Sequence, residues 1–150
     1  MVATVEQLDA ALTYCLDFAK EMLTKRGAFY PFGASISMSG KIAAVGGWDG
    51  NEHPAAAEIY SLISGALRSE AAEKKISGSA LAVDVNIPPQ YQTPWPDGIR
   101  VHLESAEYSR YIYIPYRIVK SGMLRTKTEV KLAEPVAVEI GHEVFVKNSA

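Results

Sequence analysis

Residues 27–47, GAFYPFGASISMSGKIAAVGG, decide the order of the elements in this chain. Ser39-Gly40 lies at the centre of this stretch and is typical of a tight hairpin turn. Short apolar runs alternate on both sides of it, at Ala34, Ile36, Met38, Ile42 and Ala44. Because glycine tolerates the positive φ that such turns need, the sequence predicts a hairpin with a two-residue turn. The hairpin separates two helical segments.

The segment before the hairpin predicts a long amphipathic helix. Thr4 and Gln7 have the spacing of a capping box, so the helix should begin near Thr4. Gly27 can supply the left-handed residue that ends it. Apolar residues recur at three- and four-residue intervals and predict one buried stripe, made of Val5, Leu8, Leu12, Cys15, Leu16, Ala19, Met22 and Leu23.

A second helix is expected after the hairpin. It should begin around His53-Pro54, because proline suits the first helical turn, and it should end at Ser77-Gly78. Its predicted buried stripe consists of Ile59, Leu62, Ile63, Ala66 and Leu67.

The remainder of the chain is rich in strand patterns. Alternating apolar residues predict strands around 81–87, 99–104 and 110–116, and one or two more within 130–146. A proline-rich loop, residues 88–98, follows the first of them. Consecutive strands after two helices indicate a single α+β domain over residues 1–150, with an antiparallel sheet of about five strands.

At the level of element order, helix, hairpin, helix and then three strands, the chain resembles the profilin-like group, including the roadblock-type modules and related sensor domains. The resemblance covers most of the chain and rests on topology, with no residue motif. It implies a five-stranded sheet with its strands in the spatial order 2-1-5-4-3. One fold supports many functions, so the resemblance does not name an activity.

Composition narrows the possible partners. The formal charge of −2 and the pI of about 5.9 argue against a non-specific binder of nucleic acid or of anionic membranes. No apolar run is long enough to span a membrane, and the N-terminal residues have no basic region of a signal peptide. The single cysteine, Cys15, cannot form an internal disulfide. We therefore expect a cytoplasmic protein with no nucleic-acid or membrane partner.

The strand alternation predicts a polar face of the sheet. If Leu81, Val83, Val101 and Leu103 face the helices, then the opposite face displays Asp84, Asn86, Arg100, His102, Glu104, Tyr111 and Tyr113. Tyrosine combines contact area with a hydroxyl group, so this face could bind a ligand or a second subunit. Alternatively, it is a solvated outer face with ordinary cross-strand pairs.

His102 and Glu104 lie two residues apart on one strand and project to the same side. Such a pair could bind a metal or act in acid–base catalysis. No recognised metal-ligand spacing accompanies it. Cys15 lies on an apolar stripe, where a thiol packs as a small hydrophobic group. We therefore predict no catalytic residue, no metal site and no cofactor.

Two aromatic segments are further candidates for contacts. Phe29 and Tyr30 belong to an aromatic elbow that either lines a small pocket or closes the end of the core. Trp95 lies between two prolines and is either an exposed anchor for a partner or a lid on the core. The sequence does not choose between these alternatives.

Two hypotheses follow. The first is a non-enzymatic binding or assembly module that self-associates, as a homodimer, through the polar sheet face. The second is a small-molecule-binding sensor domain or an enzyme, with a pocket near Phe29, Trp95, His102 and Glu104.

Overall fold

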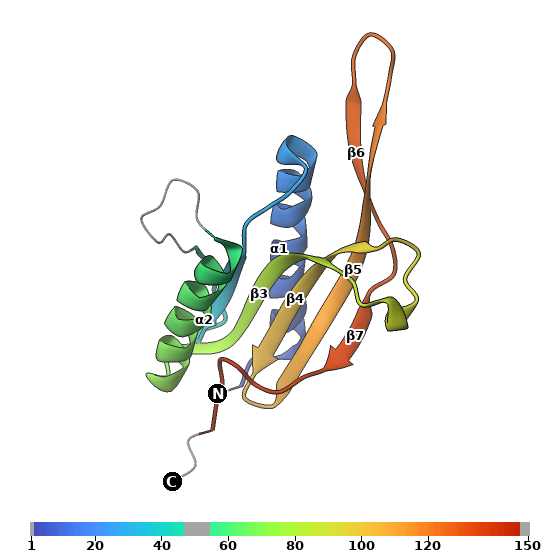
Figure 1. Cartoon of the computed structure of the whole chain (residues 1–150). Coiled ribbons are helices and arrows are strands. Elements are labelled where there is room, and N and C mark those ends of the chain that lie inside the picture. Colours follow the sequence, from blue (N-terminus) through green and yellow to red (C-terminus); the bar gives the residue numbers. More distant parts are fainter. Residues whose placement is uncertain (1, 47–54, 148–150) are drawn as a thin grey trace.

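The computed structural model describes residues 2–46 and 55–147. The chain is an α+β protein, as predicted, with two helices and a curled antiparallel sheet (Figure 1). The elements in order are α1 (Val5–Arg26), β1 (Phe32–Ser37), β2 (Ile42–Val45), α2 (Ala56–Ala72), β3 (Ile76–Asn86), a 3-10 turn (Pro89–Tyr91), β4 (Asp97–Ser105), β5 (Tyr108–Ser121), β6 (Lys127–Leu132) and β7 (Val136–Glu139).

The sheet has seven strands where about five were expected, and its order is β2-β1-β3-β4-β5-β6, with β7 paired to another part of β5. β3 therefore lies beside β1, where the profilin-like order would place the fifth strand. The reason is local: β3 begins a few residues after α2, which itself packs over β1, so the chain returns directly to the neighbouring position. The resemblance in element order does not extend to the order of strands in space.

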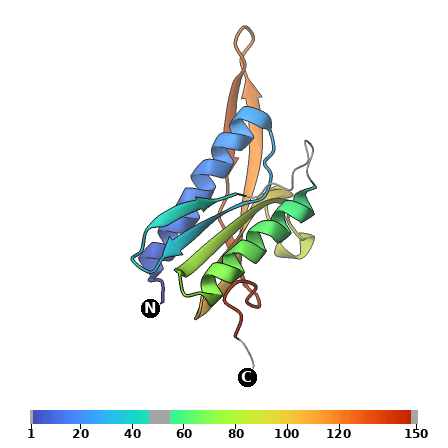
Figure 2. The same cartoon turned by 90° about the vertical axis from the view of Figure 1, so that its left-hand side faces the viewer.

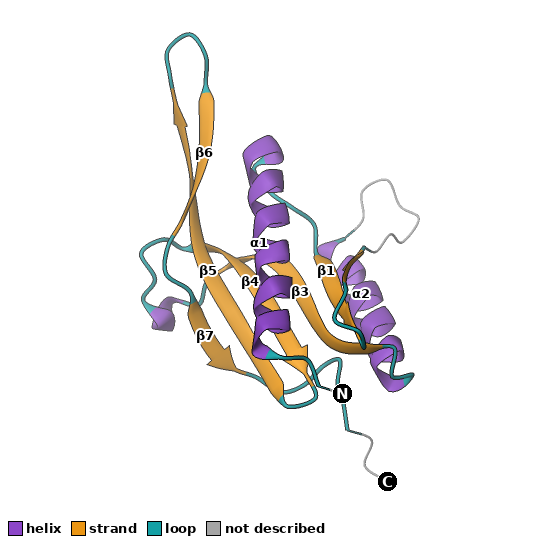
Figure 3. Ribbon diagram, turned by 180° about the vertical axis from the view of Figure 1, so that it is seen from behind, coloured by secondary structure: helices purple, strands orange, loops and turns teal. Residues whose placement is uncertain are grey.

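α1 covers one face of the sheet (Figure 3). Its capping box is confirmed: the Gln7 backbone N–H donates to Thr4 Oγ1 at 3.1 Å, and the Thr4 N–H donates to Gln7 Oε1 at 2.9 Å. Gly27 ends the helix with φ of 79°. The buried stripe is Leu8, Ala11, Cys15, Ala19 and Leu23. The prediction for Val5 was wrong, since it is 70 % exposed. Ala11, which was not predicted, is buried, and together with Ala19, which was predicted, it lets the helix approach the sheet closely.

The hairpin between β1 and β2 has a three-residue loop, so the predicted two-residue turn was wrong. The Gly40 N–H donates to the Ser37 carbonyl at 2.9 Å, and the Ser37 N–H donates to the Lys41 carbonyl at 2.8 Å. Gly40 has φ of 91°, whereas Met38 and Ser39 keep negative φ. A mirror-image two-residue turn of the type predicted from Ser39-Gly40 needs positive φ before the glycine, and Ser39 does not adopt it.

α2 covers the opposite face, but only over β1 and β3 (Figure 2). Ile59, Ile63 and Leu67 are buried, as predicted. Leu62 is 46 % exposed and Ala66 is also exposed, so including them in the stripe was wrong. The helix ends at Ala72, and the predicted stop, Ser77-Gly78, lies inside β3. The predicted start at His53-Pro54 lies outside the described residues.

The register of β3 corrects the predicted assignment of sheet faces. Leu81 lies opposite His102 and Val83 opposite Arg100, so these four residues share the face away from α1. Asp84 lies opposite Ile99 and therefore on the α1 face. The alternation misled because the first part of β3 is buried on both faces, and its α1 side is formed by Ala80 and Ala82. Because the residues on the α1 side are small, the large apolar residues of β3 lie on the opposite face.

The paired ends of β5 and β6 leave the body of the molecule as a projecting hairpin (Figure 1). Residues 120–129 of this hairpin are mostly exposed, and two of the exposed side chains, at the turn, are apolar. Among the helices that the structure describes, none combines the length and hydropathy needed to cross a bilayer.

Candidate functional site

Five of the predicted residues lie together on the sheet face opposite α1. Arg100, His102 and Glu104 project from β4, and Tyr111 and Tyr113 project from β5. His102 lies directly across from Tyr111, and Arg100 lies across from Tyr113. This antiparallel register brings side chains from two strands to one place, which is the arrangement that alternation indicated.

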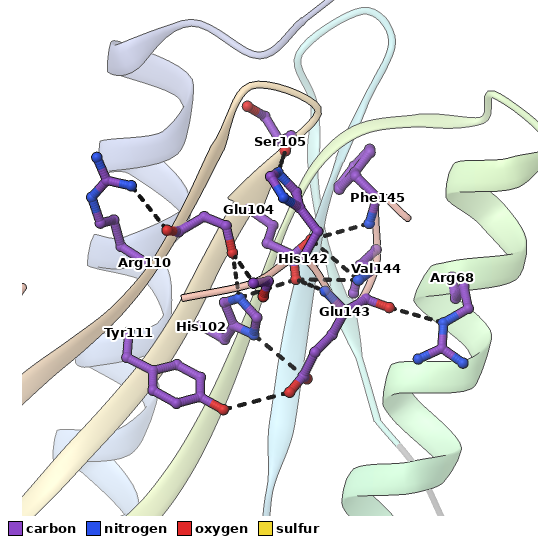
Figure 4. Close-up of polar contacts among 12 residues, drawn as sticks. Arg68, His102, Glu104, Ser105, Arg110, Tyr111, His142, Glu143, Val144 and Phe145 are labelled. Carbon is purple, nitrogen blue, oxygen red and sulfur yellow. Dashed lines mark hydrogen bonds and ion pairs between the residues drawn. The ribbon is translucent and has the colours of Figure 1, made fainter. Parts of the chain in front are cut away.

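The face is not open to solvent in the way that the sequence suggested. Residues 140–147, which we call the C-terminal strap, cross it after β7 (Figure 4). The carboxylate of Glu104 accepts hydrogen bonds from the backbone N–H groups of Glu143 at 2.9 Å, Val144 at 3.1 and 3.2 Å, and Phe145 at 3.0 Å. Glu104 is fully buried. A buried carboxylate requires donors, and the strap supplies three in succession.

His102 completes the surroundings of Glu104. Its Nε2 lies 3.1 Å from Glu104 Oε1 and 2.8 Å from Ser109 Oγ, and its Nδ1 lies 3.5 Å from Glu143 Oε2. Burial lowers the pKa of His102, because the charged imidazolium loses solvation, while the neighbouring carboxylates of Glu104 and Glu143 act in the opposite direction. The ring therefore favours its neutral form.

Glu143 joins the strap to α2 and to the sheet. Its carboxylate accepts hydrogen bonds from the Tyr60 hydroxyl at 2.6 Å and the Tyr111 hydroxyl at 3.4 Å, and its backbone carbonyl accepts from Arg68 Nε at 2.8 Å. Burial and the hydrogen bond to Glu143 raise the pKa of Tyr60. Three elements distant in sequence therefore meet at this one carboxylate.

Arg100 lies between two tyrosine rings. Its guanidinium carbon is 4.3 Å from the centroid of Tyr111 and 5.8 Å from that of Tyr60. Its Nε is buried and has no hydrogen-bond partner among the described residues. The stacking compensates part of the desolvation of the cation.

Three predicted residues lie elsewhere. Asp84 is on the α1 face, where it accepts a hydrogen bond from the Tyr116 hydroxyl at 2.6 Å. Tyr30 is 52 % exposed and lines a hollow of about 320 Å³ with Phe29, Met22, Arg26 and Ala28. Trp95 is half-buried and borders a separate hollow of about 310 Å³. Phe29, Trp95 and His102 therefore do not line one shared pocket.

Sequence reasoning missed Tyr60, Arg68, Ser109 and Glu143. Ser109 could have been found, since it lies two residues before Tyr111 on the same strand and so on the same face. Tyr60, Arg68 and Glu143 carry no comparable signal, because their contacts join α2 and the strap to strands far away in the sequence.

The site also contains a serine, a histidine and an acid in a row: Ser109 contacts His102, and His102 contacts Glu143. In hydrolases such a group activates a serine for attack on a carbonyl. Here Ser109 and His102 are 4 % and 3 % exposed, and Ser109 Oγ lies 3.3 Å from the Gly141 carbonyl, to which it can donate. A substrate carbonyl would reach Ser109 only after the strap had moved. The geometry is that of a polar network that fastens the strap to the sheet.

Within the described part of the chain, no group of three or more His, Cys, Asp or Glu side chains is arranged to hold a metal ion. Comparisons with protein-family models, with curated proteins and with solved structures find no match to this chain.

Proposed function

We propose that the chain is a cytoplasmic, non-enzymatic binding or assembly module that forms a homodimer. The polar face lies under the strap, so we assign the interface to the edge of the sheet at β2, which pairs with no further strand among the described residues. One observation carries this assignment: the two outer edges of the sheet differ in their protection against pairing.

Strand β2, with the sequence IAAV, ends the sheet and has no charged residue, and its central residues Ala43 and Ala44 are exposed. At the other end, β6 carries Lys127, Glu129 and Lys131, and β7 follows Pro135. Charged residues and proline are the usual means of preventing a strand edge from pairing with another chain. Only the β2 edge lacks these among the edge strands that the structure describes.

The hydrogen-bond pattern of the hairpin defines which backbone N–H and C=O groups of β2 are directed away from the sheet. The bond between the Ser37 N–H and the Lys41 carbonyl sets the alternation, so the backbone groups of residues 43 and 45 point toward β1. Those of Ile42 and Ala44 consequently point away from the sheet. A second copy related by a two-fold axis can pair antiparallel with this edge, each copy contributing the same residues.

Ala44→Pro tests the proposal. Proline removes the outward N–H of residue 44 and leaves the ladder with β1 intact, because that N–H takes no part in it. Analytical ultracentrifugation at high micromolar concentration should give a dimer for the wild type and a monomer for Ala44→Pro, with unchanged circular dichroism. Ala44→Val, which keeps the N–H, should remain dimeric. A monomeric wild type would refute the proposal, and a dimeric proline variant would move the interface to another surface.

A small-molecule sensor or an enzyme is the second candidate. The hollow of about 320 Å³ beside Phe29 and Tyr30 favours it, since it joins an aromatic wall to the cation of Arg26. A panel of anionic metabolites should then raise the melting temperature of the wild type, and Tyr30→Ala should abolish that shift without altering the melting temperature of the free protein. A panel without any shift would remove this candidate.

A further inference from the structure

The projecting hairpin has an unusual turn. We call residues 116–132 the arm: six residues of β5 pair with six of β6, from Tyr116 opposite Leu132 to Ser121 opposite Lys127. At about 3.3 Å per residue, these pairs span roughly 17 Å. The turn is tight: Gly122 has φ of 107°, and a side chain there would collide with the Arg125 carbonyl.

Two large apolar side chains occupy this turn. Met123 and Leu124 are fully exposed, at 103 % and 100 %. Every other large apolar residue among those described is less exposed, the next being Val5 at 70 %. The turn that contains them lies at the end of the hairpin of β5 and β6, which projects from the body (Figure 1). No contact with another described residue accounts for apolar side chains at this position.

The charge of the arm differs from that of the remainder. Five cations, Arg117, Lys120, Arg125, Lys127 and Lys131, and one carboxylate, Glu129, give the arm a formal charge of +4. Since the whole chain has a formal charge of −2, the remainder has −6. Arg117 stacks over Trp95 at the base of the arm, 5.0 Å from the ring centroid. No ion pair among the described residues involves an arm cation.

We propose that the arm docks the protein on an anionic lipid surface, with Met123 and Leu124 inserted among the acyl chains and the flanking cations on the headgroups. Basic side chains beside exposed apolar ones are the combination that binds such surfaces. The net charge of the chain led us to expect no membrane partner, but that average conceals the separation of charge between arm and body. The proposal concerns a surface distinct from the β2 edge.

The geometry favours a lipid surface over a nucleic acid. Tyr116 and Val130 at the base of the arm are buried in the core, so only the part of the arm beyond Val130 separates the body from the surface. From Val130 to Lys127 this part spans roughly 10 Å, which exceeds the Debye length of roughly 8 Å at physiological salt. In tip-first contact the repulsion between the acidic body and the surface is then partly screened. A duplex lying along the arm in one of its grooves would instead bring its phosphates near the acidic body.

Vesicle co-sedimentation tests the proposal directly. The wild type should bind vesicles of phosphatidylcholine that contain about one third phosphatidylglycerol, and this binding should weaken as salt is added. Its binding to vesicles of pure phosphatidylcholine should be poor. Met123→Ser with Leu124→Ser should weaken binding at least about 100-fold, from the loss of two buried apolar side chains. Lys120→Gln, Arg125→Gln and Lys127→Gln should weaken it by about fivefold for each charge removed. Val5→Ser, which alters an exposed apolar residue on α1, is the matched control and should bind normally.

A fluorescent probe shows whether the turn inserts. In Met123→Cys the new thiol is exposed, while Cys15 is fully buried and its pKa is raised to about 12, so a maleimide dye reacts at residue 123 alone. Dye emission should shift to the blue on anionic vesicles. Absence of vesicle binding by the wild type refutes the proposal. So does binding that the serine variant retains, or preferential binding to duplex DNA at equal salt, which would assign the arm to a nucleic acid.

Discussion

Both carboxylate oxygens of Glu104 lie within hydrogen-bond distance of the backbone N–H of Val144, at 3.2 and 3.1 Å, although 40 residues separate the two in the chain. The neighbouring N–H groups of Glu143 and Phe145 donate to the same carboxylate. One buried side chain of β4 therefore holds the backbone of the C-terminal strap. Without the strap, the buried carboxylate of Glu104 would lose its three backbone donors and keep only the contact with His102. The sheet and the strap therefore depend on each other.

Glu104→Gln should destabilise the protein. The amide keeps one acceptor oxygen but turns its NH₂ group toward N–H donors of the strap, so we expect the free energy of unfolding to fall by about 2–4 kcal/mol. Urea denaturation measures this loss, and hydrogen exchange at residues 143–145 should accelerate. Glu139→Gln is the matched control, because Glu139 is 80 % exposed in its ion pair with Arg110 and should cost less than about 1 kcal/mol. Equal losses in the two variants would contradict the role given to Glu104.

His102 should make stability depend on pH. Its pKa in the folded protein lies below that of the unfolded chain, so the unfolded chain binds the proton more tightly. The free energy of unfolding should therefore fall as pH decreases from 6.5 toward the lowered pKa of the folded state. His102→Gln should flatten this part of the profile. An unchanged profile in His102→Gln would show that another group is responsible.

Local patterns predicted the local structure well. The capping box at Thr4, the glycine stop at Gly27 and the face shared by His102 and Tyr111 all depend on residues close together in sequence or on simple alternation. The assignment of Asp84 to that face failed for a reason that alternation cannot reveal. β3 is buried on both sides, and its small residues Ala80 and Ala82 pack beneath α1 where larger apolar residues were expected.

The strap and its contacts could not be predicted. Glu143 meets Tyr60 on α2 and His102 on β4 only because β7 pairs with β5 and returns the chain across the sheet. Such contacts depend on strand order, and the strand order assumed from the resemblance was different. The buried carboxylate of Glu104 likewise gave no sign that its partners would be backbone groups.

Asp84 and Tyr116 should influence each other's ionisation. Burial raises the pKa of Asp84, while the hydrogen bond from Tyr116 and one from the Phe29 backbone limit the rise. A raised pKa means that the folded protein binds the proton more tightly, so this group adds stability at low pH that is lost as pH rises through the raised value. Tyr116→Phe should raise the pKa of Asp84 further, as followed by NMR titration of its carboxyl carbon.

The same variant should lower the free energy of unfolding at pH 7 by about 1–3 kcal/mol, because a half-buried carboxylate loses its donor. Tyr116→Phe with Asp84→Asn should recover part of that loss, since no charge remains to be solvated. A double variant no more stable than the single one would show that the tyrosine acts through packing alone.

Gly33, at the contact between β1 and α2, and Gly65, on the exposed side of α2, should respond to alanine in opposite directions. A Cβ at Gly33 on β1 would lie 2.9 Å from the Ala80 carbonyl oxygen and 3.2 Å from Ile63 Cγ2, both in buried surroundings. Gly33→Ala must therefore displace α2 or the strand, and we expect the free energy of unfolding to fall by about 1–3 kcal/mol.

A Cβ at Gly65, within α2, would meet no atom of another element within 4 Å among the described residues. Gly65→Ala should add up to about 1 kcal/mol, because alanine favours a helix over glycine. Thermal and urea unfolding of the two variants measure the signs, and a Gly33→Ala protein as stable as the wild type would mean that α2 packs less tightly on β1 than these distances require.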